Sequence, residues 1–162
     1  MSTSNLPSCG LYRTTEQIGP VPAGRLVFFH NHGDPGPGIY LPESWHLNRA
    51  RFSKKGVPLP DEAAASTLEP LPPEGLYSVR EPFHCCAKQC VAFQEDLLVQ
   101  LGYNREGKPI LFVPEWTEMG LSLPERGQGV EGDFLARLSP LKVRSTSLEG
   151  HGPSMETGRT RH

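Results

Sequence analysis

Three of the four cysteines gather in one stretch, His84-Cys-Cys-Ala-Lys-Gln-Cys90. A helical turn here would place the thiols of Cys86 and Cys90 on one face, because residues four apart are neighbours on a helix. With Cys85 or His84 added, three or four nitrogen and sulfur ligands would suit a tetrahedral zinc ion. Structural zinc sites usually take ligand pairs from two separate places in the chain, so the fold would have to supply a second source. The candidates for that source are Cys9, His30 and His32.

Two alternatives to zinc stay open for this cluster. The cysteines could be small buried hydrophobes and exposed thiols, or they could carry redox chemistry, although a reducing cytoplasm disfavours permanent disulfides. We therefore expect no resident cofactor, and zinc is the alternative. The ligands would be His84, Cys85, Cys86 and Cys90.

His30 and His32 form a second candidate pair. Strand side chains repeat every two residues, so both imidazoles fall on one face of a predicted strand. The pair suits a metal ion, or a solvated arrangement hydrogen-bonded to its own turn.

Catalytic signatures are absent from the sequence. It contains no Gly-x-Ser-x-Gly, His-Glu-x-x-His, phosphate-loop or dinucleotide fingerprint. The glycine-rich stretch Asp34-Pro-Gly-Pro-Gly38 joins two predicted strands, so it lacks the helix N-terminus that binds phosphate. Glu43 and Glu115 each follow a proline, and we expect them to end strands. We predict that the protein is not an enzyme.

An internal repeat organises the chain. Residues Leu26–Glu43 align without a gap to Leu98–Glu115, with Leu-Val at one end of both copies and Pro-Glu at the other. Flanking stretches also match, including Gly10-Leu-Tyr12 with Gly75-Leu-Tyr77 and Gly56–Pro60 with Gly120–Pro124. A repeat of this kind predicts two copies of one structural unit.

Each unit is predicted to hold five short strands and one helical turn, because short apolar stretches alternate with glycine and proline. The units span 10–73 and 74–143, between a disordered lead-in at 1–9 and a disordered tail at 144–162. The predicted strands are 10–16, 25–32, 38–45, 56–60 and 67–71, then 75–80, 97–102, 109–114, 121–124 and 138–143. The helical turns are expected at 61–66 and 133–138.

Five short strands, with a hairpin between the second and third and a turn before the last, resemble an SH3-like small β-barrel. The resemblance implies an all-β fold made of two tandem five-stranded barrels. It does not extend to peptide recognition, because neither Gly10-Leu-Tyr12 nor Gly75-Leu-Tyr77 continues into the acidic, aromatic-rich loop of that family. A shared fold does not imply a shared function.

Composition limits the function classes. The net charge of −2 gives no electrostatic case for binding nucleic acid or an anionic membrane. No apolar run approaches the roughly 18 residues of a membrane helix, and the N-terminus lacks the features of a signal peptide. We expect a cytoplasmic protein without a membrane partner.

One basic patch supports a minor alternative, a nucleic-acid adaptor, because basic and aromatic residues alternate in it. Its members are Trp45, His46, Arg49, Arg51, Phe52, Lys54 and Lys55.

We predict a non-catalytic regulator that binds another protein and masks one partner enzyme, as an inhibitor, immunity-type protein or holding chaperone. Rigid hairpins that carry turn-rich loops often present binding residues, and binding hot spots favour Trp and Tyr. The alternative is a metal- or redox-responsive module at the cysteine cluster. For the two tryptophans, a core position in each unit also stays open. The candidate contact residues are Asp34, Pro35, Pro37, Trp45, Tyr103 and Trp116.

Overall fold

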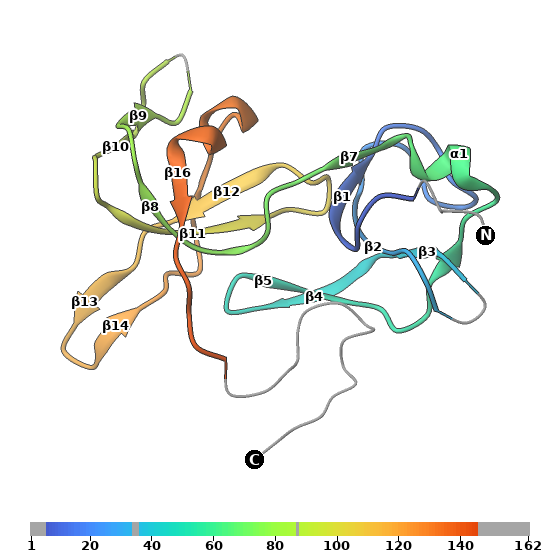
Figure 1. The fold of residues 1–162 in the computed structure, drawn as a ribbon. Helices are drawn as coiled ribbons and strands as arrows, with labels where there is room; N and C mark the ends of the chain where they lie inside the picture. The colour runs from blue at the N-terminus through green and yellow to red at the C-terminus, as the bar shows by residue number, and fades with distance from the viewer. Residues whose placement is uncertain (1–5, 34–35, 87, 146–162) are drawn as a thin grey trace.

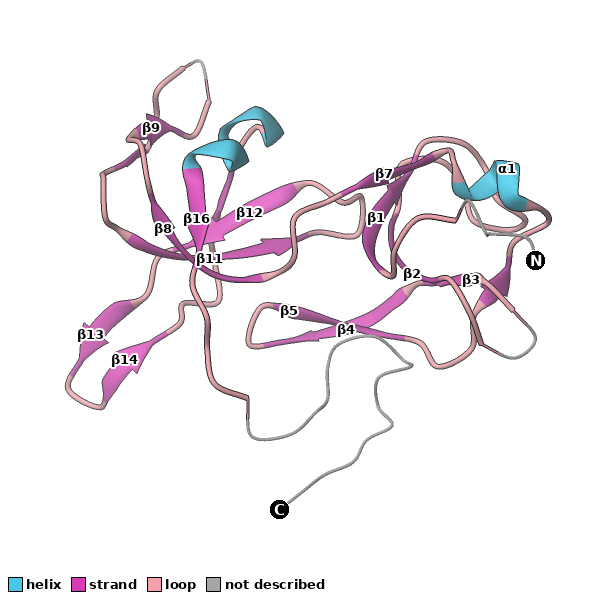
Figure 2. Ribbon diagram, viewed as in Figure 1, coloured by secondary structure: helices cyan, strands magenta, loops and turns pink. Residues whose placement is uncertain are grey.

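The computed structural model describes residues 6–33, 36–86 and 88–145 of the chain. It is predominantly β-structure, as predicted, and holds two five-stranded antiparallel sheets (Figures 1 and 2). Asp34, Pro35, most of the predicted tail and residues 1–5 of the lead-in lie outside the described residues. No described helix is both long and apolar enough to cross a membrane.

The first sheet is built from residues 10–70, with the strand order β6-β3-β2-β1-β7. A separate hairpin, β4–β5, leaves this sheet after β3 and returns the chain to β6. The elements are β1 (Gly10–Thr14), β2 (Leu26–His30), β3 (Gly38–Tyr40), β4 (Pro42–His46), β5 (Arg49–Phe52), β6 (Val57–Pro58), α1 (Glu62–Ala65) and β7 (Leu68–Pro70).

The second sheet repeats this plan, with the strand order β15-β12-β11-β8-β16 and a separate hairpin, β13–β14. In both sheets the first strand of the unit lies between the second and the last. The elements are β8 (Gly75–Val79), β9 (Phe83–His84), β10 (Ala92–Phe93), β11 (Leu98–Tyr103), β12 (Pro109–Phe112), β13 (Glu115–Thr117), β14 (Gly120–Ser122), β15 (Gln128–Gly129), the 3-10 helix η1 (Gly132–Arg137) and β16 (Leu138–Pro140).

Short helices form where the sequence predicts them, directly before the last strand of each unit. At α1 the Asp61 carboxylate accepts a hydrogen bond from the Ala64 N–H at 2.9 Å. This is the usual N-cap contact, and it satisfies one of the free N–H groups of the first turn.

The projecting hairpins differ from the sequence-based expectation. The predicted third strand, 38–45, splits at Leu41 into β3 and β4, and β4 pairs with β5, which was not predicted. The aligned stretches 56–60 and 120–124 contribute to different elements: β6 joins the first sheet, whereas β14 pairs only with β13. The fourth strand of the second sheet is β15 instead. Short stretches punctuated by Gly and Pro match by chance because these residues mark many kinds of turn.

No sheet among the described residues is closed into a barrel, so the expected tandem barrels are not established.

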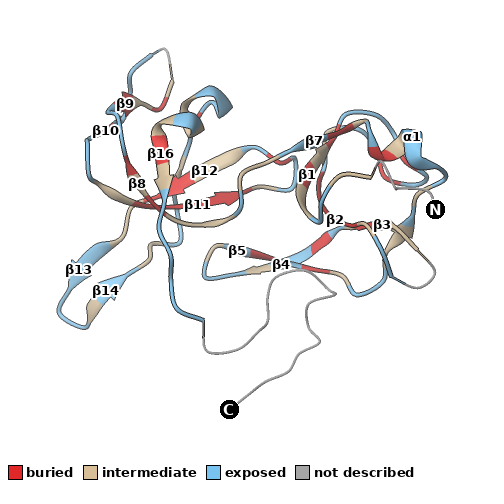
Figure 3. Cartoon of the chain, viewed as in Figure 1, coloured by how far each residue is buried: buried red, intermediate tan, exposed pale blue. Residues whose placement is uncertain are grey.

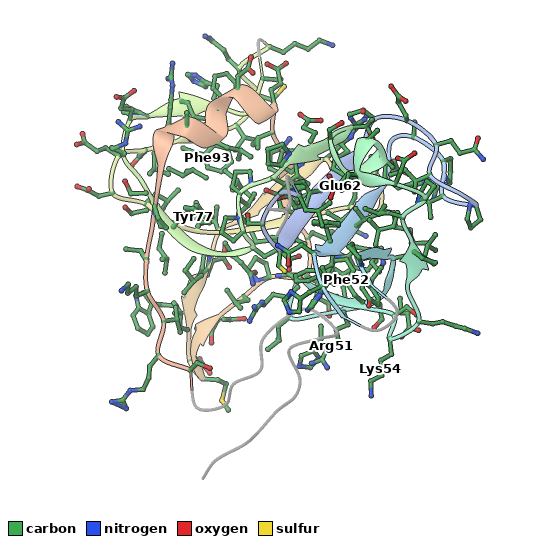
Figure 4. The ribbon with its side chains drawn as sticks, turned by 45° about the vertical axis from the view of Figure 1, so that its right-hand side comes forward. Arg51, Phe52, Lys54, Glu62, Tyr77 and Phe93 are labelled. Carbon is green, nitrogen blue, oxygen red and sulfur yellow. The ribbon has the colours of Figure 1, made fainter. Side chains whose placement is uncertain are left out.

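The two units share a core. The larger cluster of buried side chains joins Leu26, Phe28, Ala50 and Phe52 of the first unit to the interior of the second. A smaller cluster, which includes Ile18, Val27 and Ile39, belongs to the first unit alone. Figure 3 shows the buried segments along both sheets, and Figure 4 shows Tyr77 and Phe93 inside the second unit and Phe52 inside the first. The short Pro72-Pro73-Glu74 connection therefore joins two units that are packed together.

Candidate functional site

The cysteine cluster lies on the β9–β10 hairpin, which is an addition to the repeat. Residues 80–97 connect the first two strands of the second sheet, whereas 15–25 make the same connection in the first, a difference of seven residues (18 − 11). One sulfur from each of Cys85, Cys86 and Cys90 lies within 4.8 Å of the other two. The Sγ atoms of Cys85 and Cys86 are 3.7 Å apart. The structure therefore brings together the three predicted thiols.

A turn rather than a helix brings these thiols together. Gln89 has a positive φ of 58°, and its N–H donates to the Cys86 carbonyl at 2.9 Å. This closes the chain on itself between Cys86 and Cys90. His84 is not among the converging ligands. It lies between buried Phe83 and Cys85 on an extended segment, where alternate side chains point to opposite faces.

The thiols are not electrostatically equivalent. The Lys88 N–H and the neighbouring Cys85 thiol lower the pKa of Cys86, because hydrogen bonds to a thiolate stabilise it. Repulsion from Cys86 is the main cause that raises the pKa of Cys90. Cys86 therefore forms a thiolate more readily than Cys90. Three converging sulfurs can hold a soft metal ion, and one activated thiol can react with an oxidant.

The predicted second source of ligands does not reach this cluster. Cys9, His30 and His32 form a separate group around the β2–β3 hairpin. That hairpin and the β9–β10 hairpin lie at opposite ends of the molecule (Figure 1). The predicted shared strand face does not form, because β2 ends at His30 and His32 lies in the bend after it. The two rings nevertheless lie together, with centroids 4.0 Å apart, and His30 contacts the carbonyl of its own turn at His32.

Two of the predicted partner-contact aromatics are structural. Tyr103 is 2% exposed, and its hydroxyl donates to the Pro72 carbonyl at 2.6 Å. Trp45 is half-buried between the units: its Nε1 donates to the Tyr103 carbonyl at 3.0 Å, and the Arg105 guanidinium lies 5.1 Å from its ring centre. Neither ring is presented to a partner. Pro37 is half-buried, and its carbonyl accepts from the Leu59 N–H at 3.2 Å.

Trp116 has the opposite environment. It is 82% exposed on β13, and on the same hairpin Met119 is 94% and Leu121 52% exposed. Trp116 and Leu121 are direct cross-strand partners, so their side chains share one face. We call Trp116, Met119 and Leu121 the apolar hairpin surface. The sequence pattern did not predict the exposure of Met119 and Leu121, because 121–124 was expected to form a strand of the sheet and no β13–β14 hairpin was expected.

The two large aromatic residues of the basic patch, Trp45 and Phe52, are half-buried and buried. Phe52 is buried against Phe28, with ring centres 5.8 Å apart, and Trp45 lies in the interface between the units. Arg51 and Lys54 project from the surface (Figure 4). Base stacking needs an exposed ring face, so the structure adds nothing to the nucleic-acid alternative.

The interface between the units is polar as well as apolar. The Asn48 amide donates to the Gln100 side-chain oxygen at 2.9 Å, and the Gln100 amide donates to the Leu47 carbonyl at 2.9 Å. The Ala50 N–H donates to the Glu74 carboxylate at 3.0 Å. Burial raises the pKa of Glu74 to about 7, against the smaller effects of this hydrogen bond and of Arg49.

Comparisons with models of known protein families, with curated proteins and with solved structures find no match. The class of protein is therefore defined by its own architecture. It is a predominantly β-protein in which one of two equivalent hairpins is packed between the units and the other is exposed.

Proposed function

We propose that the protein is a non-catalytic regulator that binds and masks a partner protein, an enzyme, through the apolar hairpin surface. The observation that carries the proposal is the exposure of Trp116, Met119 and Leu121 on one projecting hairpin. Exposed apolar side chains that gather on one element mark interaction sites, and Trp is enriched in binding hot spots.

The equivalent hairpin of the first unit supports this proposal. In chain order β4–β5 corresponds to β13–β14, because each follows the third strand of its sheet and precedes the fourth. Within the protein, the β4–β5 hairpin packs on the second unit, where Trp45 Nε1 donates to a strand carbonyl and the turn contacts Gln100. The partner would therefore present a sheet surface to β13–β14 in the same way.

The charge of the hairpin indicates what the partner surface carries. Between Lys108 and Arg126 the chain has three acidic residues and no basic one; the acidic residues are Glu115, Glu118 and Glu125. All three are exposed. A complementary partner offers an apolar groove with a basic rim, because complementary potentials favour association.

An SH3-like architecture is part of the proposal. In its support, both sheets place the first strand between the second and the last, and a short helix precedes the last strand. The proposal does not include recognition of proline-rich peptides. Its cytoplasmic setting is supported by the four free cysteines, which suit a reducing compartment.

The test compares two substitutions of exposed apolar residues. The wild-type protein and the Trp116→Ala and Val143→Ala variants, each with its hairpin left untagged, are incubated with an extract of the source cells. The captured partner is then purified, and its affinity for each protein is measured by titration. Val143 is 65% exposed but lies outside the hairpin, so it is the matched control. We expect Trp116→Ala to weaken binding at least about 30-fold, the effect of a hot spot worth 2 kcal/mol, and Val143→Ala to leave it unchanged. Equal affinity of all three proteins, or no inhibition of an enzymatic partner, would refute the proposal.

The cysteine cluster supports a second candidate function, a metal- or redox-responsive module. It is favoured by the convergence of three sulfurs within 4.8 Å on a hairpin that the repeat does not need. The test is the metal content of protein purified without a histidine tag, and its unfolding midpoint with and without chelator. Less than about a tenth of an equivalent of metal, with no effect of chelator or of mild oxidant, would exclude this function.

A further inference from the structure

The second group of convergent ligands has features that the sequence does not reveal. Cys9 precedes β1, whereas His30 ends β2 and His32 follows it. The sulfur of Cys9 and one ring nitrogen of each histidine lie within 4.8 Å of one another. Donors around tetrahedral zinc, with bonds of about 2.0–2.3 Å, are roughly 3.5 Å apart, so a small contraction would form a site.

Both imidazoles contact an oxygen acceptor through Nδ1. His30 Nδ1 contacts the His32 carbonyl, and the His32 N–H points to the same nitrogen at 3.4 Å. His32 Nδ1 is 2.7 Å from the Asn31 side-chain oxygen, which also accepts. A proton on each Nδ1 would satisfy these contacts and leave the lone pair of each ring on Nε2. Metal-binding histidines use this arrangement, with the other nitrogen held by an oxygen acceptor.

Asn31 organises the group. Its side-chain amide donates to the Pro7 carbonyl at 3.0 Å, and this contact identifies the other side-chain atom as the oxygen that faces His32. Its backbone N–H points to Cys9 Sγ at 3.3 Å, and the thiol in turn donates to its side-chain oxygen at 3.3 Å. An N–H donor of this kind stabilises the thiolate that forms when the thiol releases its proton to solvent and binds a metal.

We propose that Cys9, His30 and His32 form a transition-metal site, with zinc as the preferred ion and the fourth position open to water or an external ligand. One thiolate and two imidazoles match the ligand types that zinc takes. The ion would join the segment before β1 to the β2–β3 hairpin. The second unit has Gly102 and Asn104 at the positions aligned with the histidines, so the site belongs to the first unit alone.

Cobalt is the probe, because a thiolate bound to Co²⁺ gives a near-ultraviolet charge-transfer band. The background protein is untagged, full-length Cys86→Ala/Cys90→Ala, which removes the other cluster while keeping buried Cys85. Metal-free protein is titrated with Co²⁺, and then with Zn²⁺ in competition. We expect one equivalent of Co²⁺ to give the band and Zn²⁺ to abolish it.

Variants at exposed positions assign the ligands without disturbing the core. We expect Cys9→Ser to abolish the charge-transfer band, and His32→Ala to weaken Co²⁺ binding at least about 10-fold. His46→Ala is the control, because His46 is also exposed and lies on β4. As a positioning residue, Asn31 should affect affinity alone: Asn31→Ala is expected to cost about 10–100-fold while the thiolate band is retained at saturation.

The proposal is overturned if the background protein shows no thiolate band at millimolar Co²⁺. It is also overturned if the band survives Cys9→Ser, which would assign it to Cys85, or if His32→Ala and His46→Ala bind Co²⁺ equally. None of these results depends on partner binding by the β13–β14 hairpin.

Discussion

Glu74 makes the docking of the two units depend on pH. Its carboxylate lies in the short connection between them and accepts from the Ala50 N–H of the β4–β5 hairpin. Burial disfavours the charged form and raises its pKa from 4.5 to about 7. The folded protein therefore binds a proton more tightly at this site than the unfolded chain does.

The direction of the pH effect follows from linkage. Between pH 4.5 and 7 the folded state holds more protons at Glu74 than the unfolded state, so the free energy of unfolding falls as the pH rises. At about 1.4 kcal/mol per pKa unit, the loss across this window is roughly 3 kcal/mol. The stabilising contribution is fully present below pH 4.5 and is lost as the pH rises through about 7.

Glu74→Gln isolates this effect, because the amide oxygen can still accept from the Ala50 N–H and no charge develops. We expect the variant to match the wild type near pH 4.5 and to be more stable by roughly 2–3 kcal/mol at pH 8. The assay is urea unfolding at constant ionic strength, followed by the fluorescence of Trp45 at the interface. Glu43→Gln, at an exposed carboxylate, is the control. Parallel stability curves for wild type and Glu74→Gln would refute the reasoning.

Two further predictions concern the docked hairpin and the reactive thiol. A Cβ at Gly102 would lie 2.8 Å from the Asn48 carbonyl oxygen, so we expect Gly102→Ala to destabilise the protein by about 1–3 kcal/mol in thermal unfolding. Gly129→Ala is the control, because a Cβ at Gly129 would have no atom within 4 Å. Equal effects of the two substitutions would contradict this prediction. Below neutral pH, iodoacetamide should modify Cys86 faster than Cys90, because of the two only Cys86 has a lowered pKa. Peptide mapping measures the order of modification, and the reverse order would contradict the prediction.

The repeat predicts much of the fold because the same pattern of strands and turns occurs twice in the chain. Strands β1, β2, β8 and β11 all lie where the sequence predicts them, and both short helices precede a last strand. The β4–β5 hairpin was not predicted. Its strand β5, Arg49–Phe52, is charged on alternate positions, and Ala50 and Phe52 are buried in the core that the two units share rather than by local sequence.

The candidate sites show the same difference: contacts between residues close in sequence could be predicted, whereas contacts between distant segments could not. Sequence proximity alone predicts that Cys85, Cys86 and Cys90 can converge, although a turn at Gln89 achieves it in place of the helix that we expected. The approach of Cys9 to His30 and His32 could not be predicted, since it depends on how the segment before β1 meets the end of β2. The spacing of the two histidines was the only local signal.

The contrast between Trp45 and Trp116 connects the repeat to the proposed function. The two residues occupy equivalent hairpins, yet one donates to a strand carbonyl of the following unit and the other is 82% exposed. Among the described residues, the first hairpin packs on the second unit, whereas the second hairpin leaves Trp116 exposed. The acidic residues on and beside the β13–β14 hairpin favour a partner with a basic surface. They disfavour a second copy of this chain, because its net charge is −2.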